Sequence, residues 1–154
     1  MKVQIIAPTQ KTPEWVKISI NEYQKRLKNE LKLEIIDIPL INRLKKPLKE
    51  IITQEGKKII KHIPQASFVI ALTETGNLLS SQAFAQHLGQ WYQQHPSLSF
   101  IIGSPEGLAD ICRDKANFTL SLSPLTFPHS MVKVILIEQL YRAITILKGH
   151  PYHK

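Results

Sequence analysis

The last eight residues, LKGHPYHK, gather side chains that could carry out proton chemistry. His150 and His153 are imidazoles, which titrate near neutral pH and can accept or return a proton. Tyr152 adds a hydroxyl and a flat ring that can stack on a planar ligand, and Pro151 restricts the backbone. Chain ends usually fray, so this concentration of capable groups raises the question of what the tail, His150–Lys154, does.

Glu138 and Arg142 are a second candidate pair. They stand four residues apart in a long apolar helical pattern, so they lie on the same side of the expected helix. On a solvated face such a pair stabilises the helix by only about 0.2–0.5 kcal/mol. On a helix that meets a partner, the pair would instead have a task at the interface. The residues alone leave both interpretations open.

A glycine-rich stretch, GSPEGL at 103–108, lies between a strand pattern and a helix pattern. Ser104 is expected to cap a helix whose first residue is Pro105, and that helix N-terminus could cradle an anionic ligand. The stretch matches neither GxGxxG nor a Walker loop, so it indicates neither a dinucleotide site nor an ATP site. An ordinary strand-to-helix turn explains the same residues, and this alternative stays open.

Metal and thiol chemistry are not expected. The six histidines lack the spacing typical of zinc ligands, and His150 with His153 would be too few. Cys112 is the single cysteine, so no internal disulfide can form. Its place in an apolar helical pattern predicts a buried, inert thiol.

Strand and helix patterns alternate along the chain. Apolar runs rich in β-branched residues predict strands at 2–8, 31–39, 67–73, 98–103 and 118–123. Amphipathic runs predict helices at 12–28 with Thr12 as N-cap, and at 47–60, 82–94, 105–116 and 129–148. This alternation predicts one α/β domain over residues 1–154, with a mostly parallel sheet flanked by helices. Because ligands of such sheets bind beyond the carboxyl ends of the strands, the loops after the last three strands should form the site.

The formal charge of +8 is unevenly distributed. Residues 1–61 contain 14 Lys and Arg against 7 Asp and Glu, whereas residues 62–154 contain 6 against 5. The excess forms three clusters: Lys25, Arg26 and Lys28; Arg43, Lys45, Lys46 and Lys49; Lys57, Lys58 and Lys61. A one-sided basic surface attracts polyanions, of which nucleic acid is the commonest in a cytosol, although solvated helix faces explain the charges equally well.

The remaining composition bears on location and assembly. The segment 1–10 lacks the apolar core of a signal peptide, and no apolar run approaches the roughly 18 residues of a membrane span. We therefore expect a cytoplasmic protein without a membrane partner. The last helical pattern, 129–148, is apolar nearly all round. Because its own sheet can cover only one side, we expect a homodimer.

Three stretches, FIIGSPEGL, SLSPLTFPHSMVKVILIEQLYRA and HPYHK, closely resemble the RlmH family of methyltransferases, and the likeness spans essentially the whole chain. The resemblance implies a SPOUT-type α/β knot, with a deep C-terminal trefoil knot, in a homodimer. It implies a donor, S-adenosylmethionine, that leaves as S-adenosylhomocysteine. It also implies a substrate, N3 of a pseudouridine in a stem-loop of 23S ribosomal RNA within the assembled 70S ribosome. The cofactor contacts that it implies are Leu72, Gly103, Leu122, Ser123, Pro124, Leu125, Thr126 and Phe127.

The chain departs from the family pattern at Ser104, where a second glycine is usual, at Thr73, where aspartate is frequent, and at Pro124, where alanine is expected. These changes bear on the affinity for the donor.

The resemblance also suggests catalytic roles. The target nitrogen carries a proton that must leave, and His153 or His129 is the candidate acceptor. Arg142 could stabilise the developing anion, with Glu138 beside it at the dimer interface, and Tyr152 could stack on the base. The tail is then expected to fold over the cofactor. Two alternatives remain: a non-catalytic knotted module that binds RNA or ribosomes, and a SPOUT methyltransferase that acts on transfer RNA.

Overall fold

The computed structural model describes residues 1–154 and contains one five-stranded sheet. The strands are β1 (Lys2–Thr9), β2 (Lys32–Pro39), β3 (Ser67–Leu78), β4 (Ser97–Ile102) and β5 (Phe118–Ser121). Their order across the sheet is β2-β1-β4-β3-β5, and every neighbouring pair is parallel. The prediction of a mostly parallel sheet is therefore confirmed.

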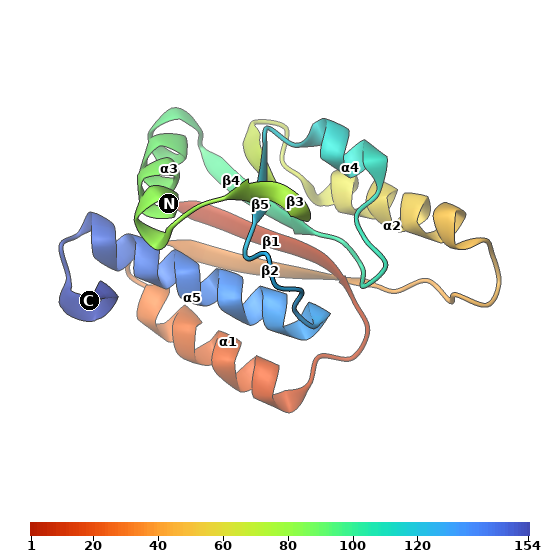
Figure 1. The fold of residues 1–154 in the computed structure, drawn as a ribbon, viewed down its shortest axis with the longest axis horizontal. Helices are drawn as coiled ribbons and strands as arrows, with labels where there is room; N and C mark the ends of the chain where they lie inside the picture. The colour runs from red at the N-terminus through yellow and green to blue at the C-terminus, as the bar shows by residue number, and fades with distance from the viewer.

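Helices cover both faces of this sheet (Figure 1). The helices are α1 (Glu14–Leu27), α2 (Leu48–His62), α3 (Ser81–Gln94), α4 (Asp110–Lys115) and α5 (His129–Leu147), followed by the short 3₁₀ turn η1 (Pro151–His153). Helix α5 packs between α1 and α3 on one face, while α2 and α4 pack together on the other. The helices thus alternate with the strands as the sequence patterns predict.

Burial on both faces explains the apolar strands. All six residues of β4 are buried, and Phe100 at its centre is fully inaccessible. Apolar side chains pointing toward α1, α3 and α5 form the larger core, and those pointing toward α2 and α4 form the smaller one. Strands buried in this way read as continuous apolar runs rather than alternating ones.

Two predicted helix starts are wrong. Thr12 does not cap α1, because the capping position is Pro13 and no side chain bonds the free amides there. Ser104 does not cap a helix either, since α4 begins only at Asp110. The residues between form a turn that ends at Gly107, whose φ of 120° lies outside the range of a helix.

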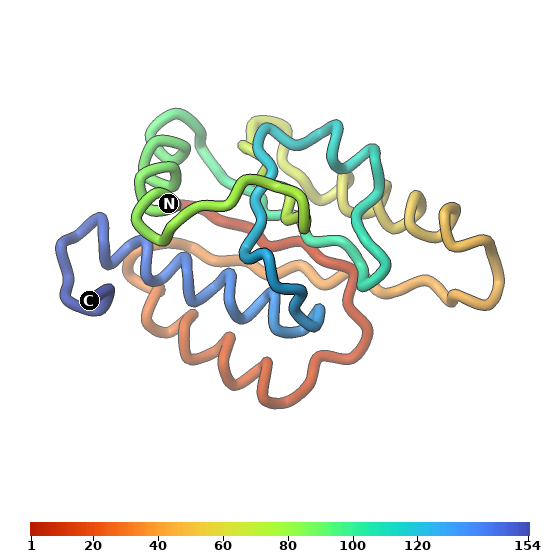
Figure 2. The backbone as a smooth tube through the Cα atoms, viewed as in Figure 1, coloured from red at the N-terminus to blue at the C-terminus, as the bar shows by residue number.

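Strand β3 bends over β5 between two segments that pair with it. Leu120 of β5 pairs with Leu72 of β3 and, farther along the same chain, with Asn77. A strand has two hydrogen-bonding edges, so the chain from 72 to 77 must cross a face of β5 to reach the second edge. Figure 2 shows this segment passing over β5. At the crossing, a Cβ on Gly76 would lie 2.7 Å from the backbone carbon of Leu120, so only glycine fits without a shift.

We predict that Gly76→Ala destabilises the protein by about 1–3 kcal/mol, because the new methyl group meets backbone that cannot rotate away. Urea unfolding of parent and variant measures the difference. Gly89→Ala is the matched control: its Cβ would meet only the flexible end of Leu147 at 3.3 Å, and alanine favours a helix interior. A Gly76→Ala variant as stable as this control would contradict the crossing.

Candidate active site

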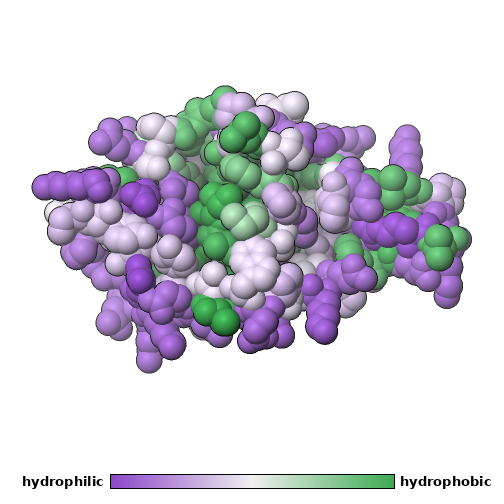
Figure 3. All heavy atoms as spheres, turned by 60° about the horizontal axis from the view of Figure 1, so that its bottom comes forward, coloured by the Kyte–Doolittle hydropathy of each residue, from purple (hydrophilic) through white to green (hydrophobic).

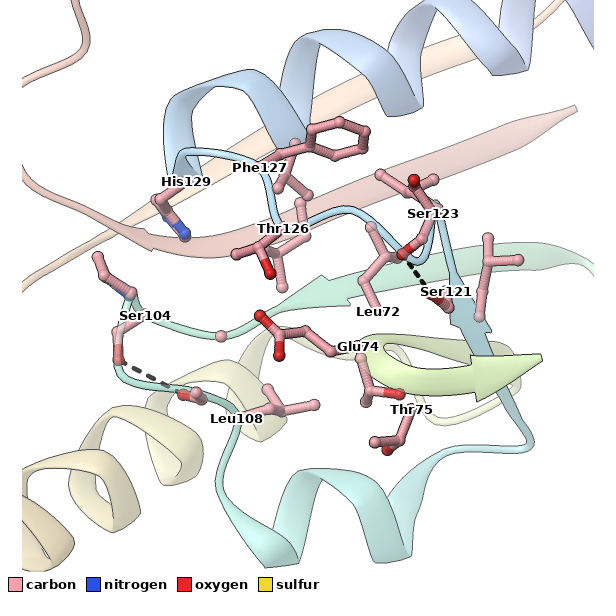
Figure 4. Close-up of a pocket in the computed structure, with 18 of the residues that line it drawn as sticks. Leu72, Glu74, Thr75, Ser104, Leu108, Ser121, Ser123, Thr126, Phe127 and His129 are labelled. Atoms are coloured by element: carbon pink, nitrogen blue, oxygen red, sulfur yellow. Dashed lines mark hydrogen bonds between the residues drawn. The ribbon is translucent and has the colours of Figure 1, made fainter. Parts of the chain in front are cut away.

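A cavity of about 640 Å³ opens beyond the carboxyl ends of β4 and β5, beside the part of β3 that begins at Leu72 and the start of α5 (Figure 4). This is the edge that the strand-end rule selects. The predicted cofactor residues that line the cavity are Leu72, Gly103, Leu122, Ser123, Leu125, Thr126 and Phe127. Pro124 does not line it and is exposed. The volume is within the range of small-molecule sites.

The floor of the cavity is the turn that follows β4. The Gly107 amide donates to the Ser104 carbonyl at 2.9 Å, which closes the turn. A Cβ on Gly103 would lie 2.6 Å from the Gly107 backbone, so the two glycines allow the chain to fold tightly against itself. The glycine-rich stretch therefore shapes a pocket wall by backbone contact rather than by a helix N-terminus.

The opposite wall is the loop between β5 and α5, and it is braced by its own serines. Ser121 Oγ donates to the Ser123 carbonyl at 3.1 Å, and the Leu125 amide donates to Ser123 Oγ at 2.9 Å. These bonds turn the chain so that Thr126 and Phe127 line the cavity. The two bonds therefore brace this wall from within the loop.

His129 lines the same cavity at the first turn of α5. Its Nε2 lies 3.0 Å from the Pro8 carbonyl. A carbonyl only accepts, so Nε2 carries the hydrogen and Nδ1 keeps its lone pair. Burial lowers the pKa of this imidazole, partly offset by the bond to Pro8. A neutral histidine with a free Nδ1 can accept a proton.

The sequence reasoning missed two carboxylates in the lining, Glu74 and Glu106. Figure 4 shows the Glu74 carboxylate pointing into the cavity, and Glu74 has no hydrogen-bond or ion-pair partner in the chain. Glu74 lies within β3, two residues beyond Leu72, where the pairing of β3 with β4 ends. Because the sequence predicts that this strand ends at residue 73, attention to every polar residue that follows would have found Glu74.

Glu106 is held by a guanidinium from a distant segment. Arg43 Nε and Nη2 donate to the two Glu106 oxygens at 3.2 and 2.9 Å. This contact with Arg43 lowers the pKa of Glu106 to about 2. Arg43 also pairs with Glu55 of α2, Nη1 to Oε2 at 2.7 Å. Arg43, which the sequence groups with the basic clusters, is therefore engaged internally and is not free to bind a polyanion.

The other predicted catalytic residues form a separate cluster on the C-terminal half of α5. Arg142 Nη2 lies 2.8 Å from Glu138 Oε1, and the guanidinium lies 5.0 Å from the centre of the Tyr152 ring. The Tyr152 hydroxyl donates to Glu138 Oε1 at 3.3 Å. Burial raises the pKa of Tyr152 to about 12, so the phenol keeps its proton at neutral pH.

The tail does not reach the cavity of its own chain. None of Glu138, Arg142, Tyr152 and His153 lines it. Arg142 lies 13 residues beyond His129 on α5, which is about 20 Å along the helix, and the tail lies at the far end of α5 in Figure 1. The expectation that the tail folds over the cofactor does not hold within one chain, because Glu138 and Arg142 hold the tail against α5.

Comparisons with known proteins place this geometry in a family. A family model described as "Predicted SPOUT methyltransferase" matches residues 1–153. The chain belongs to the SPOUT methyltransferase family. The protein named ribosomal RNA large subunit methyltransferase H in Thioalkalivibrio sulfidiphilus (strain HL-EbGR7) is 41% identical over 155 residues, covering 100% of this chain and 99% of the relative. Its namesake in Hahella chejuensis (strain KCTC 2396) is 42% identical over 156 residues, with 100% and 99% covered. These matches confirm the resemblance to RlmH.

A solved structure agrees with the SPOUT assignment at the level of the fold. A probable methylase family protein from Haemophilus influenzae Rd KW20 superposes with a TM-score of 0.57 at 13% sequence identity. The match covers 96% of this chain and 66% of that one. A SPOUT fold implies a C-terminal trefoil knot.

SPOUT methyltransferases use S-adenosylmethionine, and the cavity fits this donor. Its walls combine apolar side chains, among them Leu72, Ile102 and Leu108, with exposed backbone at the Gly103 turn and the free carboxylate of Glu74. Apolar surface suits the adenine, and a carboxylate suits the donor's hydroxyl and ammonium groups. No group of three or more His, Cys, Asp or Glu gathers as metal ligands. No helix has the length and apolar character needed to cross a membrane.

We predict that Glu106 contributes stability that is present above its ordinary pKa of 4.5 and is lost as the pH falls through about 2. The sign follows from a folded pKa that lies below the unfolded one. The difference in the free energy of unfolding between parent and Glu106→Gln, measured with urea from about pH 6 to 2, should shrink toward the acid end. A difference that stays constant over this range would contradict the ion pair.

Proposed function

We propose that the chain methylates large-subunit ribosomal RNA with S-adenosylmethionine, and that its target is N3 of a pseudouridine in a stem-loop of 23S RNA within the cytoplasmic 70S ribosome. The observation that carries the proposal is the donor-sized cavity at the three strand-end loops, in a chain 41% identical over its full length to a protein named for ribosomal RNA methylation. The pseudouridine and the assembled ribosome come from the family resemblance.

The reaction sets three requirements for the protein. S-adenosylmethionine supplies an electrophilic methyl group on a sulfonium. The N3 imide must lose its proton, form a bond to the methyl carbon as the carbon–sulfur bond breaks, and leave S-adenosylhomocysteine behind. The chain must therefore align the base with the methyl group, accept the proton and stabilise negative charge on the base as the proton leaves.

Of the candidate residues for the last two tasks, only His129 lines the cavity of its own chain. Arg142, Tyr152 and His153 do not, so a site that uses them would draw on two copies. We propose a homodimer in which the tail of one protomer meets the cavity of its partner. Met131 and Ile135 of α5 are only half-buried and join neither core. Figure 3 shows a band of apolar atoms across the face that carries α1 and α5. A second copy would bury this band.

Within that site, Glu138 orients the other groups. It accepts from Arg142 Nε at 3.0 Å and from the Tyr152 hydroxyl. Arg142 Nη1 makes no hydrogen bond in the chain, so it can donate to an oxygen of the deprotonated base. His153 Nδ1 is buried without a partner, and His129 Nδ1 faces no donor. Either imidazole can take the N3 proton, and Tyr152, which stays protonated, can stack on or donate to the base.

The RNA would meet the basic loop and α2. Lys45, Lys49, Lys57, Lys58 and Lys61 are exposed there without ion-pair partners, and Lys46 is only loosely paired with Glu50 at 3.6 Å. This surface begins next to the Glu106 turn of the cavity, because Arg43 connects the two segments. Phosphates held by these lysines would position the stem-loop without reading its bases.

We predict that truncation after Gly149 lowers methyl transfer to 70S ribosomes by at least about 100-fold, because the chain loses Tyr152 and His153. The truncated protein should still bind S-adenosylmethionine in equilibrium dialysis, since the cavity is built from other segments. Turnover that persists undiminished would remove the tail from catalysis.

Subunit mixing is the control for this prediction. Gly103→Ala should displace the turn that forms the cavity floor, because its Cβ would lie 2.6 Å from the Gly107 backbone, and should abolish donor binding while leaving the tail intact. Each variant alone should be inactive, but mixed dimers of the two should recover one working site per dimer. No recovery on mixing would place the tail and the cavity of a site in the same protomer.

We also predict that Lys45→Glu with Lys46→Glu weakens ribosome binding and lowers its salt dependence by about two units of slope, one for each lysine that no longer neutralises a phosphate. Filter binding at several salt concentrations measures both effects. Lys2→Glu with Lys32→Glu is the matched control, because these exposed lysines lie at the amino ends of β1 and β2, away from the cavity. If both pairs of substitutions weaken ribosome binding equally, the effect is one of net charge, and the basic loop is not a specific RNA contact.

A further inference from the structure

The ion-paired cluster around Arg43 performs no step of the proposed reaction, yet it connects three separate segments. Arg43 belongs to the loop between β2 and α2, Glu55 to α2, and Glu106 to the turn after β4. Arg43 Nη1 also donates to the Ile41 carbonyl at 2.8 Å, which fixes the side chain against its own loop. A guanidinium with this many fixed partners is an anchored group, not a mobile surface charge.

Glu55 is the fixed point of the cluster. Its side chain is 2% exposed, and a buried carboxylate is tolerated only when its oxygens are fully bonded. Glu55 Oε2 accepts from the Ile41 amide at 3.0 Å and from Arg43 Nη1 at 2.7 Å, and Oε1 accepts from Arg43 Nη2 at 3.0 Å. The two residues therefore hold each other in one arrangement on the rigid helix α2.

Glu106 is the member of the cluster whose own segment is held least firmly. It lies in the turn from Ser104 to Gly107, where Pro105 and Glu106 are exposed. The turn is closed by one backbone bond and by a long bond from Ser104 Oγ to the Gly107 carbonyl at 3.4 Å. Such a turn has few contacts of its own to hold it against the body of the protein. The two bonds from Arg43 attach it to α2 through Glu55, and Pro105, Glu106 and Gly107 all line the cavity.

We propose that Arg43 is a positioning residue for methyl-donor binding: fixed on Glu55, it holds Glu106 and hence the Gly103–Gly107 turn in the conformation that receives S-adenosylmethionine. The inference rests on the proposed function, since it assigns the donor to this cavity. Arg43 itself does not line the cavity, so it acts through Glu106 and not by touching the donor. Without the bonds from Arg43, the turn is in the binding conformation for only part of the time. The apparent affinity for the donor is reduced in proportion to the population of that conformation.

The test uses Glu106→Gln, because this variant releases the turn and leaves the buried Arg43–Glu55 pair intact. We expect the dissociation constant for S-adenosylhomocysteine, measured by calorimetry without RNA, to rise roughly 10-fold, as for loss of charge-assisted hydrogen bonds. The melting temperature of the unliganded variant should fall, because the ion pair also stabilises the fold, so binding is measured well below that temperature. At saturating donor the turnover number should stay near that of the parent, so the loss appears in KM for the donor.

Arg43→Lys is the second variant, since lysine keeps the charge but cannot bond both carboxylates in the same geometry. It should weaken donor binding as Glu106→Gln does, and the double variant should be no worse than either alone, because both break one link. Glu14→Gln, which alters an exposed pair with Lys17 on α1, is the control and should bind like the parent.

Three results would contradict the positioning role, and they can be told apart. If the parent binds S-adenosylhomocysteine and both Arg43→Lys and Glu106→Gln bind it equally well, the positioning role is wrong. If the variants lower only the melting temperature, Arg43 is a stabilising residue and nothing more. If the parent binds no S-adenosylhomocysteine, the proposed function falls, and this inference falls with it.

Discussion

The bend of β3 over β5 is the constraint on which the rest of the structure depends. Because Leu120 pairs with Leu72 on one edge and with Asn77 on the other, the loop after β3 cannot move away from β5. The end of β4 pairs with Leu72 as well. Three loops that would otherwise diverge beyond a parallel sheet are thus held together, and the cavity between them is a consequence of topology. The constraint accounts for the glycine at position 76, because a Cβ there would collide with the Leu120 backbone.

Helix α5 divides the proposed chemistry between its two ends. Its first turn places His129 in the cavity, whereas its C-terminal half carries Glu138 and Arg142 and receives the tail. A straight helix cannot bring its two ends together. The donor cavity of a chain is therefore far from its Arg142 and Tyr152, which would act on the RNA base. The interpretation of Glu138 and Arg142 as an isolated surface pair underestimates them, because the same carboxylate also accepts from Tyr152. The pair belongs to a network, not to a solvated face.

Sequence patterns predicted those helices and strands whose bounds are set by local burial. The apolar runs of β1 and β4 and the amphipathic spacing of α2 and α3 predicted elements within a few residues of their ends, since burial on one or two faces sets those patterns. The failures lie where distant segments decide. Ser104 looks like a cap, but Gly107 and Arg43 make it part of a turn. The extension of β3 to Leu78 depends on pairing with β5, some 40 residues later. The identity of the cavity residues came from the strand-end rule and the family resemblance together, while the ion pair of Arg43 with Glu106 needed the fold.

The distance between cavity and tail has a consequence for dosage. In the proposed dimer, each chain contributes its cavity to one site and its tail to the other. A chain on its own therefore has no complete site, and dilution that separates the two chains removes the activity. Below the dissociation constant of the dimer, the number of working sites would rise with the square of the amount of chain. Cells could then set the extent of modification through expression level alone, with a threshold that an enzyme complete in one chain would not have.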